Sequence, residues 1–301
     1  MDPSRRQFNR LLLAGLPLSA AYGASDFDVM GGIQFGIESF SFHDLPRGVP
    51  QTVIPKIIEY MKYLGLTEVE PVTSHIEPFG DNPSMRNYGS REDLRKWRLT
   101  VPMSFYQNIR KQFEDAGMRI MYYDIVPGMS YTDAEIDRTF EAAHALGAVG
   151  LGSSIKLNEL ERLVPFAEKH KMIVAMHNHN SVCDANELAT PASLERGLAM
   201  SMQYMVNLDL GHYAAGNNDS IDFIRRHPDR VAFLHVRDRK KNDGRYTPNG
   251  KGDAKVGETL RFIRDHKYPI RAYIEYEYGT YRTPLEEIRN GLQFCKDALA
   301  A

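Results

Sequence analysis

Histidines and carboxylates gather at the ends of the expected strands in this 301-residue chain. Six of the ten histidines stand at such positions: His43, His75, His177, His179, His212 and His235. Four carboxylates stand at the same level: Glu70, Asp209, Glu275 and Glu277. The other four histidines fall in the last turns of expected helices, where a cation suits the helix dipole, so we interpret them as surface residues.

Imidazoles and carboxylates that meet in one buried place predict a metal site. Residues two positions apart on a strand point to the same face. The pairs that share a face are His177 with His179, Asn207 with Asp209, His235 with Arg237, and Glu275 with Glu277. Buried charges need partners, and a divalent ion can satisfy two imidazoles and two carboxylates that arrive from four adjacent strands. Mixed nitrogen and oxygen ligation favours Mn, Zn, Co or Fe over Ca, and Mg is also compatible. A metal-free polar network is the alternative.

Eight strand-like runs alternate with helical runs and would position these side chains. The expected strands are 33–42, 67–74, 119–127, 148–154, 172–179, 205–212, 231–238 and 270–277. This alternation predicts an α/β fold, a (β/α)8 TIM barrel with eight parallel strands, rather than a doubly wound sheet. Chemistry in such barrels lies at the C-terminal ends of the strands. The long loop from His75 to about Val101 is interpreted as a lid.

The first residues resemble an export signal. Arg5 and Arg6 precede an apolar run from Leu11 to Ala21, which is too short to span a membrane. Paired arginines are typical of a twin-arginine signal. We therefore expect a signal peptide at 1–24, a single barrel domain at 25–301, export to the periplasm or beyond, and no membrane association once the signal is removed.

Charge and cysteine content exclude some classes of protein. A formal net charge of −2 argues against a nucleic-acid partner. Two cysteines do not make a disulfide framework. We expect a small-molecule carbohydrate as the partner, and association with further copies of the chain is left open.

Several longer segments carry a family likeness. The run MVNLDLGHYAAGNNDSIDFIRRHPDRVAFLHVRDRKK, followed by GKGD and YIEYEYG, resembles the xylose isomerase-like barrel superfamily. The segments LRKWRLTVPMSFYQNIRKQFEDAGMRI and EIDRTFEAAHALGAVGLGSS are similar to its sugar phosphate isomerase/epimerase-like branch. The superfamily includes sugar isomerases and epimerases, inosose and 3-dehydroshikimate dehydratases, and endonuclease IV. The resemblance covers nearly all of the chain after the signal.

The resemblance implies a set of site residues. Asp209, His235 and Glu275 match three of the family's four metal ligands, and His212 matches a histidine that lies beside the substrate. Epimerases similar to D-tagatose 3-epimerase carry Glu-Asn-His where this chain has His177-Asn178-His179. His177 is then the expected fourth ligand, and His179 a substrate contact. The change removes one of the two carboxylates with which those epimerases transfer protons.

The implied function is a divalent-metal-dependent sugar isomerase or epimerase that acts through a metal-stabilised enediolate. Glu275 is the expected base, with Glu277 and His212 as further catalytic candidates. Expected substrate contacts are Glu70, His75, His179 and Arg237. Arg237 could equally form a salt bridge with Glu277. The alternatives are a lyase or dehydratase on a 3-keto-glycoside or inosose-like substrate, and a non-catalytic sugar-binding barrel. A nuclease is disfavoured, because it needs more metal ligands and a basic face.

Overall fold

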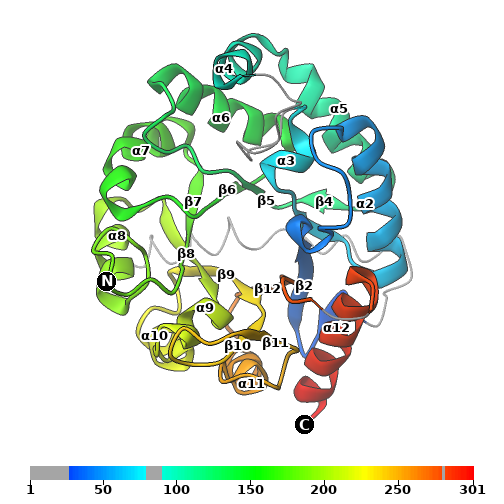
Figure 1. The fold of residues 1–301 in the computed structure, drawn as a ribbon, viewed down its shortest axis with the longest axis vertical. Coiled ribbons are helices and arrows are strands. Elements are labelled where there is room, and N and C mark those ends of the chain that lie inside the picture. The colour runs from blue at the N-terminus through cyan, green and yellow to red at the C-terminus, as the bar shows by residue number, and fades with distance from the viewer. Residues whose placement is uncertain (1–26, 79–89, 280–281) are drawn as a thin grey trace.

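A computed structural model of the chain describes residues 27–78, 90–279 and 282–301. The expected signal segment 1–24 and the middle of the expected lid, 79–89, lie outside these residues. Figure 1 looks along the barrel, with a ring of helices around a central parallel sheet. Among the described residues no helix is both long and apolar enough to cross a bilayer.

The sheet is parallel and follows the chain order around the barrel. Its strands are β2 (Ile33–Glu38), β3 (Glu68–Glu70), β4 (Arg119–Ile120), β5 (Tyr122–Asp124), β6 (Gly150–Ser153), β7 (Ile173–His177), β8 (Tyr204–Asp209), β9 (Val231–Val236) and β12 (Arg271–Ile274). The hydrogen-bonded order is β4-β3-β2-β12-β9-β8-β7-β6-β5. Two short hairpins pair β1 (Val29–Met30) with β2, and β10 (Asp238–Arg239) with β11 (Tyr246–Thr247).

Met121 closes the barrel. It is the single residue between β4 and β5, its N–H donates to Val69, and its carbonyl accepts from Val149. These bonds join the β3 side of the sheet to the β6 side, so β4 and β5 are two segments of one strand. The predicted (β/α)8 barrel with eight parallel strands is confirmed for the described chain.

Helices follow the strands and cover the outside of the barrel. They are α2 (Pro50–Leu64), α3 (Thr73–Ile76), α4 (Arg91–Thr100), α5 (Met103–Asp115), α6 (Asp133–Leu146), α7 (Leu157–His170), α8 (Pro191–Met200), α9 (Leu210–Ala215), α10 (Ser220–Arg226), α11 (Val256–His266) and α12 (Pro284–Ala300), with one 3-10 turn at Ser39–Ser41. The expected loop from His75 to Val101 is partly wrong, since α3 ends inside it and α4 lies within it. A Ser90/Asp93 capping box begins α4.

The interior of the barrel has an apolar layer beneath its mouth. This layer consists of Met121, Tyr122, Ile173, Ala175, Met205, Ala232, Phe233 and Tyr273. Side chains two positions further along a strand lie on the same face and nearer its C-terminal end. His235 therefore lies directly above Phe233, with 5.5 Å between the ring centroids, and Glu275 follows Tyr273. The polar residues at the mouth therefore lie directly above aromatic side chains.

Candidate metal centre

The four expected metal ligands come together at the mouth of the barrel. One ligand atom each from His177, Asp209, His235 and Glu275 all lie within 4.8 Å of one another. The register of the sheet explains this, because His177 pairs with Asn207 and Asp209 pairs with His235 across neighbouring parallel strands. Asn178 fixes the end of β8 by accepting the N–H of Asp209 at 2.8 Å and donating to its carbonyl at 3.2 Å.

The strands end earlier than expected, and this changes the position of His212. The expected strand 205–212 ends at Asp209, whose side chain accepts the N–H of His212 and caps α9. His212 therefore lies in the first turn of a helix rather than on a strand. An N-terminal capping interaction of this kind competes locally with strand pairing. His212 nevertheless still faces the mouth.

Arg237 lies among the acidic side chains and is buried, with 4% of it exposed. Its guanidinium forms ion pairs with Asp209, with Glu275 at 2.8 Å and with Glu277. The expected salt bridge between Arg237 and Glu277 is therefore present. Burial alone would raise the pKa of Glu275, but Arg237 and then His235 outweigh it and lower that pKa to about 2.

His235 lies between two carboxylates. Its Nε2 is 2.7 Å from Glu70 and its Nδ1 is 2.9 Å from Glu275. Burial disfavours the charged imidazole, but Glu70 and Glu275 together raise the pKa of His235 well above its usual range. Glu70 thus reaches the same site as the expected ligands, although it comes from β3 on the far side of β2 and β12.

Glu38, which the sequence analysis missed, adds a further buried carboxylate. It ends β2 and pairs in register with Glu70. Burial and then the charge of Glu275 raise the pKa of Glu38 well above its usual range. The signal that could have found it is its position, because it is a carboxylate at the last residue of a strand, as Glu70 is.

The donor set fits a divalent cation. Glu38, Glu70, Asp209 and Glu275 are each at most 7% exposed, and the buried guanidinium among them is that of Arg237. Glu38 Oε2 and Glu70 Oε1 are buried without a hydrogen-bond partner among the described residues. Burial raises the pKa of Asp209 to about 7 although Arg237 opposes it. These four carboxyl groups face the cationic side chains of Arg237 and His235, and a doubly charged ion would favour the ionised form of the carboxyl groups whose pKa burial raises.

The orientation of His177 depends on Asn207. The Asn207 carboxamide lies 3.3 Å from His177 Nδ1 and 3.1 Å from His235 Nε2, while its Oδ1 has no partner among the described residues. Turning the amide so that its oxygen faces His177 would let Nδ1–H donate and leave Nε2 free to bind a metal. Burial and then the neighbouring His235 lower the pKa of His177 well below its usual range, which keeps this imidazole neutral.

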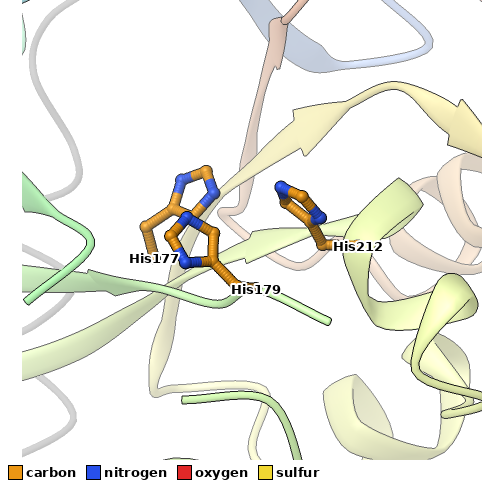
Figure 2. Close-up of side chains that lie close together, drawn as sticks. All are labelled: His177, His179 and His212. Atoms are coloured by element: carbon orange, nitrogen blue, oxygen red, sulfur yellow. The ribbon is translucent and has the colours of Figure 1, made fainter. Parts of the chain in front are cut away.

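A second group of histidines adjoins the ligand set. Single ring nitrogens of His177, His179 and His212 also lie within 4.8 Å of one another. In Figure 2 the rings of His177 and His179 lie together, and the ring of His212 faces them from α9. His179 has 37% of its side chain exposed, so this group forms the solvent side of the site.

Gly152 makes room for Glu70. A Cβ built on Gly152 would overlap Glu70 Oε1, far inside van der Waals contact. To accept that Cβ, the Glu70 carboxylate would have to shift from its present position. The glycine in β6 is therefore part of what holds Glu70 against His235.

His75, an expected substrate contact, lies in α3 and is 1% exposed. Its Nδ1 is 2.9 Å from the hydroxyl of Ser39, and its Nε2 has no hydrogen-bond partner among the described residues. Burial, and then Arg47, lower the pKa of His75 to about 4. The structure does not bring His75 into either of the two ligand groups.

Comparison with known proteins agrees with this architecture. Residues 156–298 match the family model described as xylose isomerase-like TIM barrel. Together with the closed parallel barrel, this confirms the resemblance found in the sequence, and the fold is that of a xylose isomerase-like TIM barrel. No match to this chain is found among the curated proteins.

Solved structures with the same fold are distant in sequence. L-ribulose 3-epimerase is 13% identical with a TM-score of 0.65, covering 88% of this chain and 94% of its own. The IolI protein with a bound zinc atom is 11% identical with a TM-score of 0.64, covering 88% and 98%. The probable 3-DHS dehydratase AsbF from Bacillus anthracis is 14% identical with a TM-score of 0.60, covering 86% and 97%. At these identities the likeness shows the fold.

Proposed function

We propose that the chain is a divalent-metal-dependent enzyme that isomerises or epimerises a sugar by proton transfer next to a carbonyl group. The observation that carries the proposal is the convergence of His177, Asp209, His235 and Glu275 in a buried site that is rich in carboxyl groups. These residues would hold the ion, with Mn, Zn or Co favoured by their mixed nitrogen and oxygen donors. When bound, the ion supplies Lewis-acid polarisation of the substrate carbonyl.

Two carboxylates that reach the substrate from different sides would allow proton transfer on both of its faces. Glu70 and Glu275 meet opposite nitrogens of the His235 ring, so they approach the mouth from two directions. Residue 177 is His where the similar epimerases carry Glu, and Glu70 would supply the carboxylate that this change removes. One of the two would remove the α-proton and the other would return a proton at the neighbouring carbon or on the opposite face.

Other residues of the chain would orient the substrate. Arg237 is held by Asp209, Glu275 and Glu277, so its guanidinium is fixed before a substrate arrives. His179 and His212 would contact substrate hydroxyls on the solvent side of the site. The apolar layer below His235 prevents water from entering from beneath.

A lyase or dehydratase is the second candidate. His179 favours it, because elimination of a β-substituent needs a group that protonates the leaving oxygen, and His179 lies beside His177 with its Nδ1 3.3 Å from the Glu187 carboxylate. One neighbour in fold is the probable 3-DHS dehydratase AsbF. Both reactions begin with the same proton abstraction, and they diverge only after that step.

Exchange with solvent deuterium tests this proposal. Protein loaded with Mn, Co or Zn would be incubated in D2O with ketoses, inososes and 3-keto-glycosides, and carbon-bound deuterium would be followed by NMR after removal of any Mn. We expect deuterium at the carbon next to the carbonyl, with a rearranged sugar for an isomerase or an unsaturated product for a lyase. A product formed without deuterium would contradict proton exchange with solvent.

A further inference from the structure

We infer that His179 and His212 present opposite hydrogen-bonding atoms to the mouth of the barrel, a nitrogen lone pair on His179 and an N–H on His212, because Glu187 and Arg239 fix their tautomers. The inference deepens the proposed function and rests on it for the role of the pair, which is to bind one hydroxyl group of a sugar. Arg239 and Glu187 are then positioning residues.

Arg239 determines the tautomer of His212. Its guanidinium lies 2.7 Å from His212 Nδ1 in a buried contact. Arginine has only donors and does not lose its proton in proteins, so Nδ1 must be the acceptor. A neutral imidazole that accepts at Nδ1 carries its proton on Nε2. The Nε2–H of His212 is therefore the atom left for other partners.

Arg239 is itself firmly held. It donates to the carbonyl of Gly244 and to Asn180 Oδ1, each at 3.0 Å, and its guanidinium lies 4.4 Å from the ring centroid of Tyr246. The preceding residue, Asp238, accepts the backbone N–H groups of three residues in the loop that follows β11, namely Gly250, Gly252 and Ala254. The side chain that sets the tautomer is thus fixed by several independent contacts.

Glu187 fixes His179 in the opposite tautomer. Its carboxylate lies 3.3 Å from His179 Nδ1, and an ionised carboxylate only accepts hydrogen bonds. The proton of His179 is then on Nδ1, so the neutral ring keeps its lone pair on Nε2. Lys156 lies 3.4 Å from the same carboxylate and forms an ion pair with it.

The two rings form a receptor for a hydroxyl group. Their centroids are 5.0 Å apart, and no hydrogen bond joins them directly in the described structure. A hydroxyl donates one hydrogen bond and accepts others, which matches the lone pair of His179 and the N–H of His212. The N–H that His212 presents excludes His212 as a ligand of a second metal ion together with His177 and His179, since a ligating histidine needs its lone pair toward the metal and an acceptor on its other nitrogen.

Imidazole 15N NMR of the free, full-length protein tests the inference, with assignments from His179→Asn and His212→Asn. We expect protonated Nε2 on His212 and protonated Nδ1 on His179. In Arg239→Met the His212 signals should move toward a mixture of tautomers, Arg239→Lys should restore them, and Arg245→Met in the same loop should leave them unchanged. Unprotonated Nε2 on His212 in the starting protein would overturn the inference.

Metal binding and turnover provide further readouts. Titration with Zn should saturate at one ion per chain without broadening the Nε2–H signal of His212, and a second ion bound there would also overturn the inference. With a substrate found by deuterium exchange, Arg239→Met should lower kcat/KM about fivefold to tenfold, as for one lost hydrogen bond. Because the tautomers are measured without substrate, an inactive protein with the expected tautomers would contradict the proposed function alone.

Discussion

The carboxylate of Glu70 lies 2.7 Å from Nε2 of His235, although the two residues are 165 positions apart in the chain. Glu70 ends β3 and His235 lies near the end of β9, so the contact crosses the mouth of the barrel. The contact places Glu70, which is not one of the expected ligands, against the nitrogen of His235 that lies opposite Glu275. This relationship makes Glu70 a proton-transfer candidate as well as an expected substrate contact.

Glu70→Gln should separate catalysis from metal binding. The amide keeps the size of the side chain but cannot accept a proton, and a lost general base costs about 10²–10⁴-fold in rate. We expect turnover to fall in this range while the protein keeps its bound metal, as measured by steady-state kinetics and elemental analysis. Loss of metal together with activity would instead make Glu70 a ligand.

Gly152→Ala should act through Glu70. The added methyl group would overlap Glu70 Oε1 and displace the carboxylate from His235. We expect reduced turnover, with the circular dichroism spectrum and metal content retained. Gly279→Ala is a matched control, because a Cβ there meets nothing within 4 Å. Equal activity of the two variants would show that the position of Glu70 does not matter.

Glu275→Gln should weaken metal binding and abolish turnover, because it removes a charged ligand from a buried set. Glu277→Gln tests the neighbouring carboxylate, which is 33% exposed and paired with Arg237 but outside the expected ligand group. It should retain the metal. Isothermal titration with Mn or Zn would measure both, and an unaltered affinity in Glu275→Gln would refute the ligand assignment.

Acid should destabilise the protein through His75. Its pKa falls from 6.5 to about 4 on folding, because the ring is buried. The unfolded chain therefore binds a proton below pH 6.5 that the folded chain does not bind until about pH 4, so stability is lost as pH falls between these values. The loss attributable to His75 is up to about 3 kcal/mol. Urea unfolding of His75→Gln should show a shallower pH dependence, and parallel curves would contradict this origin.

Much of the barrel could be predicted from the sequence, because apolar residues recur with different periods in strands and in helices, and because the ends of the helices are clearly marked. Met121 was expected inside one strand, and it does join β4 to β5. The strand ends were placed too late, since side-chain capping by Asp209 starts α9 where the apolar pattern of the strand still continues. Periodicity does not reveal such a cap.

The site could be predicted less completely. Strand alternation placed His177, Asp209, His235 and Glu275 on one rim, and they converge. Contacts across the barrel, such as that between Glu70 and His235, depend on barrel diameter and stagger, which one sequence does not supply. The hydrogen bond from Arg239 to His212 depends on a loop conformation, which likewise leaves no periodic signal.

Metal content decides whether the buried ligand set holds an ion. Purified full-length protein would be measured for Mn, Co, Zn and Mg per chain, and its thermal unfolding would be compared before and after treatment with a chelator. We expect about one divalent ion per chain and a lower Tm in chelator that the added metal restores, because bound metal stabilises the folded state. A protein that binds no divalent metal and unfolds at the same temperature with and without chelator would refute the metal centre.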